Sequence, residues 1–160
     1  MSLSEGDRIP DVAVTIPGDD GTPKPAQTGE LLGKGKVVLF AVPGAFTPGC
    51  SNFHLPGFVL RADEVKAKGV DTIACIAVND AFVMHAWSQD QHADAIQMIG
   101  DGNGEFTKAV GLEFDGSGIG LGTRSQRYAA ILQDGVVQKI FVEPKPGVDV
   151  SSVENVLANL

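Results

Sequence analysis

Two cysteines, Cys50 and Cys75, are the residues of this chain best suited to nucleophilic or redox chemistry. They lack the spacing of a zinc knuckle or a Cys-x-x-Cys pair, so each must be interpreted singly. Cys50 follows Pro48-Gly49, a tight turn that leads into an expected helix from about residue 50 to residue 68. A cysteine in the first turn of a helix lies near unpaired backbone N–H groups and the positive end of the helix dipole. That setting favours the nucleophilic thiolate.

Thr47 precedes Cys50 by three residues, which is close enough to place its hydroxyl beside the sulfur. The hydroxyl could donate to a thiolate or accept from an incoming hydroperoxide. Cleavage of a peroxide O–O bond needs an in-line thiolate and donors that stabilise charge on the leaving oxygen. The pattern therefore favours peroxide reduction at Cys50. The alternative is a buried structural thiol, which fits poorly with the surrounding Pro-Gly turns.

Two unbroken apolar runs, Lys36–Val42 and Asp71–Val78, must position this segment. Runs without alternation are typical of parallel strands covered on both faces. With the helix between them they form a βαβ unit, whose crossover should be right-handed. Cys50 then lies just beyond the carboxyl end of the first strand, where sites of open α/β sheets collect.

The rest of the chain predicts further elements of the same sheet. Asp80 opens a helix, Asp134-Gly135 marks a tight antiparallel hairpin between Tyr128–Leu132 and Val136–Val142, and Ser151 with Glu154 is spaced as a capping box. Apolar faces are expected at Phe82, Val83, Ala86 and Trp87, and at Val153, Val156, Leu157 and Leu160. Asp19–Pro25 and Gly116–Gly122 are interpreted as loops. The fold class is α/β, with a central mixed β-sheet flanked by helices, and the order of elements best matches a thioredoxin-like fold.

Composition limits the remaining possibilities. The 160 residues, 43% of them hydrophobic, suit a single domain spanning 1–160. A net charge of -8 with no basic block argues against nucleic acid and anionic membranes as partners. No secretory signal or membrane-spanning run is recognisable, so we expect a cytoplasmic protein. His54, His85 and His92 lack metal-ligand spacing, and we expect neither a metal nor a cofactor.

The segment Pro43-Gly-Ala-Phe-Thr-Pro-Gly-Cys-Ser51, followed by His54-Leu-Pro-Gly57, resembles the peroxiredoxins. It is most similar to their type II branch, which includes plant type II enzymes and mammalian peroxiredoxin five. The stretches Gly69–Trp87 and Gly120–Tyr128 are similar to the same branch, so the resemblance covers nearly the whole chain. It implies a thiol peroxidase that reduces hydrogen peroxide and alkyl hydroperoxides through a sulfenic acid.

The resemblance also implies roles for individual residues. Cys50 matches the peroxidatic cysteine, Thr47 the hydroxyl that orients the peroxide, and Pro43 the residue that shields the sulfur from water. An arginine should approach from a distant strand. Arg127 is the better match because it immediately precedes Tyr128 at the start of a strand, whereas Arg124 is interpreted as a solvated charge.

Gly49 and His54 are expected to border the substrate pocket. His54 lies one helical turn beyond Cys50, where it could tune the thiolate; a helix-surface histidine is the alternative. Pro56 removes an N–H from the helix, which predicts a kink after His54.

Cys75, inside an apolar strand, is interpreted as a buried, inert thiol. The alternative, a resolving cysteine that attacks the Cys50 sulfenic acid, would need the two Cα atoms within about 7 Å. The mammalian type carries its resolving cysteine in a C-terminal region that here reads Gly147–Ser152, without cysteine. This departure predicts a one-cysteine cycle completed by glutathione, glutaredoxin or thioredoxin.

The resemblance further implies a homodimer packed through loops near the active site, including those around Phe46 and Phe82. Two other functions remain open from the sequence. One is a thiol–disulfide oxidoreductase, which the absence of Cys-x-x-Cys disfavours. The other is a thioredoxin-like binding or holdase module with an incidental thiol.

Overall fold

The computed structural model describes residues 2–160. Its elements in chain order are β1 (Ala13–Pro17), β2 (Pro23–Gln27), α1 (Thr28–Leu32), β3 (Lys36–Ala41), the π-helix η1 (Cys50–His54), α2 (Leu55–Leu60), α3 (Ala62–Ala67), β4 (Thr72–Ala77), α4 (Ala81–Gln91), β5 (Gln97–Gly100), α5 (Glu105–Ala109), β6 (Glu113–Asp115), the 3₁₀-helix η2 (Ser117–Ile119), β7 (Thr123–Ser125), β8 (Tyr128–Gln133), β9 (Val136–Val142) and α6 (Val153–Ala158). Within the described residues, no helix has the length and apolar character to cross a membrane.

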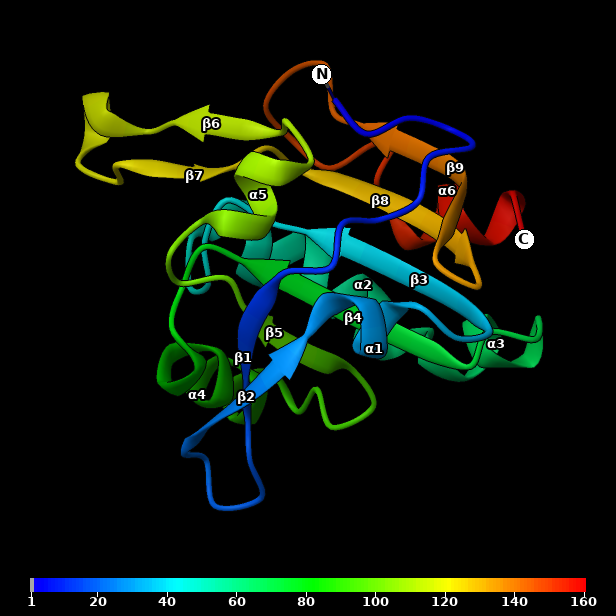
Figure 1. Cartoon of the computed structure of the whole chain (residues 1–160), viewed down its shortest axis with the longest axis horizontal. Helices are drawn as coiled ribbons and strands as arrows, with labels where there is room; N and C mark the ends of the chain where they lie inside the picture. The colour runs from blue at the N-terminus through cyan, green and yellow to red at the C-terminus, as the bar shows by residue number, and fades with distance from the viewer. Residues whose placement is uncertain (1) are drawn as a thin grey trace.

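A seven-stranded mixed sheet forms the centre of the molecule, in the order β2-β1-β5-β4-β3-β8-β9 (Figure 1). Strands β3, β4 and β5 are parallel. Strand β8 continues the sheet antiparallel to β3, and β9 pairs antiparallel with β8. The two apolar runs predicted as strands are β3 and β4, and the mixed sheet is confirmed. All but the first residue of each is buried, which explains why neither run alternates.

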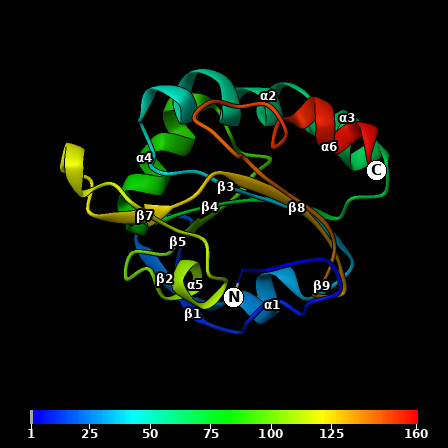
Figure 2. The same cartoon turned by 90° about the horizontal axis from the view of Figure 1, so that it is seen from above.

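Helices cover both faces of the sheet (Figure 2). Helices α2, α3, α4 and α6 lie on one face, and α1 and α5 lie on the other. Each face has its own apolar core, one built around Phe40, Phe58 and Trp87 and the other around Leu39 and Phe106. The hairpin β6–β7 projects from the sheet beyond α5 (Figure 1).

The single helix expected from residue 50 to residue 68 is divided into three pieces, η1, α2 and α3. The first change follows His54, where the backbone passes from π to α geometry. The kink predicted at this place stays a prediction. Leu55 N–H donates to the Cys50 carbonyl, five residues back. Pro56 has no N–H to donate, which removes one α-helical hydrogen bond at this place. The second break, at Arg61 with φ −112° and ψ 19°, carries no proline or glycine and was not expected.

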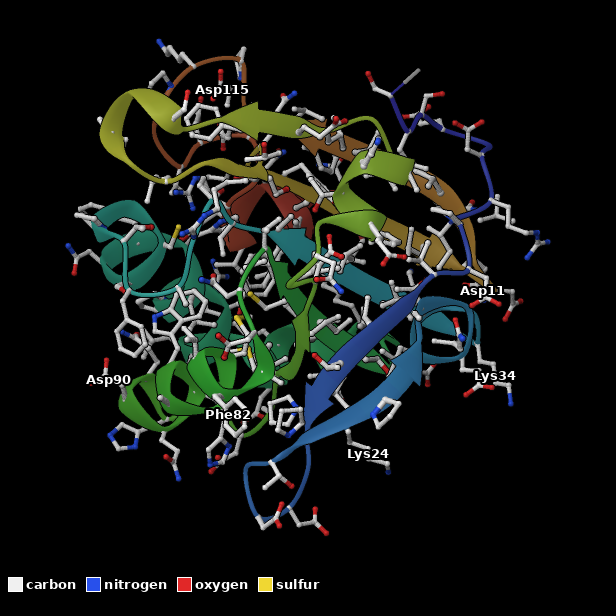
Figure 3. All side chains as sticks on the ribbon, turned by 60° about the vertical axis from the view of Figure 1, so that its left-hand side comes forward. Asp11, Lys24, Lys34, Phe82, Asp90 and Asp115 are labelled. Atoms are coloured by element: carbon white, nitrogen blue, oxygen red, sulfur yellow. The ribbon has the colours of Figure 1, made fainter. Side chains whose placement is uncertain are left out.

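Helix α4 buries only part of the face predicted for it, Trp87 fully and Val83 in part. Asp80 caps the helix as expected, its side chain accepting from Val83 N–H. The buried residues, however, are Ala81, Met84 and Trp87, whereas Phe82 is 60% exposed. Phe82 lies on the outer side of the helix (Figure 3). An isolated helix pattern cannot distinguish a stripe that packs on the sheet from one left outside it, because both are apolar.

Two turns and one helix cap depend on local side-chain chemistry. Asp134 and Gly135 both have positive φ, 50° and 81°, as the predicted two-residue hairpin requires. The cap of α6 lies one residue later than the sequence pattern predicts: Ser152, not Ser151, accepts from Asn155 N–H. The predicted loop from residue 19 to residue 25 also contains the start of β2, an edge strand in which prolines are tolerated.

Candidate active site

Cys50 lies at the end of the loop that leaves β3. The helical segment begins at Pro48, so Cys50 falls within its first turn, and Ser51 N–H donates to the Thr47 carbonyl at 2.9 Å. The cysteine is fully buried in the core beneath α2, α4 and α6. Asn79 also fixes this loop: its side-chain oxygen accepts from Ala45 N–H at 2.9 Å and so connects the loop to the segment that follows β4. The loop that carries Cys50 is thus attached to the ends of both parallel strands of the βαβ unit, β3 and β4.

Thr47 contacts the sulfur directly. Its Oγ1 lies 2.9 Å from Cys50 Sγ and 2.7 Å from the Gly44 carbonyl oxygen. A hydroxyl carries one hydrogen and two lone pairs. When that hydrogen is donated to Gly44, the lone pairs face the sulfur and can accept a proton from the thiol or from a hydroperoxide.

Arg127, immediately before β8, reaches the same sulfur. Its Nη2 donates to Cys50 Sγ at 3.2 Å. A Cβ placed at Gly49 would lie only 3.0 Å from that Nη2 atom, so glycine leaves the room that the guanidinium occupies. The one ion pair within residues 2–160 joins Arg61 and Glu64 elsewhere, so in this part of the chain no carboxylate neutralises Arg127. Its charge is available to stabilise a thiolate.

His54 lies under Arg127 and is only 1% exposed. Its Nδ1 lies 2.9 Å from Arg127 Nη1, and its Nε2 lies 2.9 Å from the Ser151 carbonyl oxygen. An arginine can only donate, so Nδ1 accepts and Nε2 carries the hydrogen that Ser151 receives. Burial, reinforced by the charge of Arg127, lowers the pKa of His54 to about 3. The ring is therefore neutral at physiological pH.

Together these groups can hold a thiolate and a hydroperoxide in one geometry. The sulfur can act as a nucleophile, the Thr47 hydroxyl offers an acceptor, and the Arg127 guanidinium offers donors. No group of three or more His, Cys, Asp or Glu in residues 2–160 could hold a metal ion.

Comparison with known proteins gives the family. A model of the redoxin family matches residues 4–157. The chain is 46% identical to peroxiredoxin-2E, chloroplastic, of Arabidopsis thaliana, covering 99% of this chain and 70% of the relative. It is 43% identical to peroxiredoxin sll1621 of Synechocystis, covering 88% of this chain and 79% of the relative. The chain belongs to the peroxiredoxins.

Solved structures agree with this assignment. Reduced Prx3 of Vibrio vulnificus in complex with hydrogen peroxide is 48% identical, with a TM-score of 0.93 and 98% of each chain covered. Peroxiredoxin 5 of Alvinella pompejana is 37% identical, with a TM-score of 0.86, 98% of this chain and 96% of that chain covered. The fold of this peroxiredoxin is therefore the thioredoxin-like fold of its family, as the sequence predicted.

The structure brings Cys50, Thr47, Gly49 and Arg127 of this peroxiredoxin into one cluster. Pro43 lies in the same loop, and its carbonyl oxygen accepts from Arg124 Nη1 at 3.3 Å. Its shielding of the sulfur stays a prediction.

Two of the sequence interpretations need correction. His54 is not a helix-surface residue, because its ring is buried between Arg127 and Ser151. Nor is Arg124 simply solvated: it also donates to the Leu121 carbonyl, and its Nη1 would lie 2.6 Å from a Cβ at Gly44. Arg124 thus links the projecting hairpin to the loop before Thr47.

Cys75 lies in the middle of β4, opposite Phe40 of β3, and is fully buried. Burial raises the pKa of its thiol well above the ordinary value, and the nearby Cys50 raises it further. Both cysteines are free thiols in the structure. The predicted burial of Cys75 is confirmed, and its inertness stays a prediction.

Sequence reasoning missed three polar groups around the site. Trp87 Nε1 donates to Ser51 Oγ at 3.0 Å, and Ser51 is the residue that follows Cys50. Ser151 supplies the carbonyl that fixes His54, and Glu143 in turn holds Ser151. The sequence pattern predicts a helix cap at Ser151 instead, and no local pattern indicates that its backbone carbonyl contacts His54.

Proposed function

We propose that this peroxiredoxin reduces hydrogen peroxide and alkyl hydroperoxides with Cys50 as the attacking thiolate. The observation that carries the proposal is the cluster around Sγ, with Thr47 Oγ1 at 2.9 Å and Arg127 Nη2 at 3.2 Å. The crystallised relative from Vibrio vulnificus, named as a complex with hydrogen peroxide, supports this substrate class.

The reaction balances with the groups at the site. The thiolate sulfur attacks one peroxide oxygen, a new S–O bond forms and the O–O bond breaks. The sulfur is oxidised to a sulfenic acid, and the other oxygen leaves as hydroxide or alkoxide, which takes a proton to become water or an alcohol. Arg127 donates to the sulfur and to the developing negative charge, while Thr47 accepts from the peroxide O–H and fixes its orientation. Pro43, at the mouth of the loop, limits access of water to Sγ.

The test is peroxide consumption by the pre-reduced protein, with intact mass recorded before and after one equivalent. The wild type should consume peroxide and gain one oxygen at Cys50. The variant Cys50→Ser should do neither, while Cys75→Ser, which alters the other buried thiol, should retain the activity. Equal consumption by wild type and Cys50→Ser would refute the proposal.

We further propose a one-cysteine cycle in which an external thiol, glutathione, glutaredoxin or thioredoxin, reduces the sulfenic acid. Support comes from the burial of Cys75 within β4 and its raised pKa, which oppose formation of an attacking thiolate. A structural relative at 32% identity, from Plasmodium falciparum, is described as a 1-Cys peroxiredoxin.

Oxidation in the presence of glutathione distinguishes the two cycles. A mixed disulfide at Cys50 is expected, and turnover should persist in Cys75→Ser. A Cys50–Cys75 disulfide, with turnover lost in Cys75→Ser, would establish the two-cysteine cycle instead. Rates with glutaredoxin and with thioredoxin then identify the better reductant.

A homodimer is proposed from two exposed aromatic side chains near the site. Phe46, with φ 66°, is 51% exposed, and Phe82 is 60% exposed. The Ala45–Asn79 hydrogen bond joins the loop of Phe46 to the segment that leads into α4 and Phe82. Light scattering should give a dimer mass for the wild type and a lower mass for Phe82→Arg. An unchanged monomer mass at high protein concentration would contradict the proposal.

A single redoxin domain over 1–160 and a cytoplasmic location complete the proposal. The family match over residues 4–157 supports the first. Fractionation of cells that express the full chain tests the second, since two relatives carry "chloroplastic" in their names.

A further inference from the structure

Glu143, the residue after β9, forms hydrogen bonds with the segment that leads into α6. One carboxylate oxygen, Oε2, accepts from Asp149 N–H at 2.7 Å, Ser151 N–H at 2.9 Å and Ser151 Oγ–H at 2.6 Å. Partial burial alone would raise the pKa of Glu143, but these hydrogen bonds lower it below its ordinary value. The side chain is therefore an ionised anchor at neutral pH.

The group that this anchor fixes is the Ser151 carbonyl. Ser151 is fully buried, and its carbonyl oxygen receives the Nε2 hydrogen of His54 at 2.9 Å. That bond sets the tautomer of His54 and turns its Nδ1 lone pair toward Arg127. Because His54 is packed against Phe40 and Phe58, with ring centroids 5.0 Å and 5.7 Å away, the ring has little freedom to find another partner.

A second bond joins Glu143 to Arg127 through the backbone. Glu143 N–H donates to the Arg127 carbonyl at 3.0 Å, in continuation of the β8–β9 pairing. Glu143 thus contacts the backbone of Arg127 directly, and through Ser151 it fixes His54, the hydrogen-bond partner of the Arg127 guanidinium. The chain of contacts runs from Glu143 through Ser151 and His54 to Arg127, and ends at Cys50 Sγ.

We propose that Glu143 is a positioning residue for peroxide reduction, which orients the Arg127 guanidinium through the Ser151 carbonyl and the His54 ring. The inference rests on the role proposed above for Arg127. It assigns a function in the chemistry to a residue that lies outside the active-site loop and has no hydrogen bond to Cys50 Sγ.

The experiment measures the second-order rate of peroxide consumption by the pre-reduced chain in a set of variants. Glu143→Ala should lose roughly 10- to 100-fold, because small misplacement of a transition-state donor has effects of this size. Glu143→Gln, whose amide oxygen can still accept, should recover most of the rate. Glu154→Ala is the matched control: it removes an exposed carboxylate from the first turn of α6, outside the chain of contacts, and should react like the wild type.

A double-mutant cycle with His54→Asn tests the route of the effect. Glu143→Ala should have at most a twofold effect in the His54→Asn background, because the relay is already broken there. Additive losses, or a full rate in Glu143→Ala, would overturn the inference. If Glu143→Ala fails to fold, Glu143→Asp is measured in its place, because its side chain is one methylene shorter. The same outcomes then support or overturn the inference. An inactive wild type would instead refute the proposed function itself.

Discussion

Acid should destabilise this protein through His54 in a pH range where carboxylates contribute little. The histidine is buried and neutral, with a folded-state pKa of about 3. An unfolded chain restores an ordinary histidine pKa of about 6.5. Below that value the unfolded state binds a proton that the folded state does not accept. Stability is therefore complete above pH of about 6.5 and is lost progressively as the pH falls toward 3.

The magnitude follows from the two pKa values. Each pH unit within the window removes about 1.4 kcal/mol, so lowering the pH from 7 to 5 should remove about 2 kcal/mol through this one group. For a chain of this length that corresponds to a fall in Tm of roughly 4–8 °C.

Urea denaturation of wild type and His54→Asn at both pH values isolates the effect. The variant cannot titrate at this position, so the change between pH 7 and pH 5 should be about 2 kcal/mol smaller than in the wild type. The other histidines and the carboxylates contribute equally to the pH dependence of stability in both proteins, so their contributions cancel when the two proteins are compared. Equal pH dependence in the two proteins would refute the buried, neutral assignment of His54.

Three further outcomes test the site. Thr47→Val should remain folded but react with peroxide far more slowly than Thr47→Ser, which keeps the hydroxyl beside Cys50; similar rates would exclude an acceptor role. Gly49→Ala places a Cβ 3.0 Å from Arg127 Nη2, so the peroxide rate should fall while Tm stays nearly constant, and a fall in Tm alone would point to packing instead. Ser152→Ala should destabilise the fold by about 1 kcal/mol through loss of the α6 cap without changing the initial peroxide rate, both measurable on one preparation.

Short-range patterns determined much of the architecture. The apolar runs gave β3 and β4, Asp134-Gly135 gave the β8–β9 turn, and Asp80 gave the start of α4. In each case the physical cause lies within a few residues: continuous burial, positive φ, or a side-chain cap. The active-site loop was equally local, since Thr47 and Cys50 are close in sequence.

Tertiary structure decided what distant segments contribute. It selected which apolar stripe of α4 is buried, because packing on the sheet rather than hydrophobicity alone sets that choice. It brought Arg127 to Cys50, which the sequence predicted only through family resemblance. His54 was buried rather than exposed because Phe40, Arg127 and the segment before α6 close over it. The Ser151 carbonyl could not be predicted, since a main-chain acceptor leaves no sequence signal and its partner His54 is distant in sequence. The Glu143 anchor could not be predicted either, because it acts on that carbonyl.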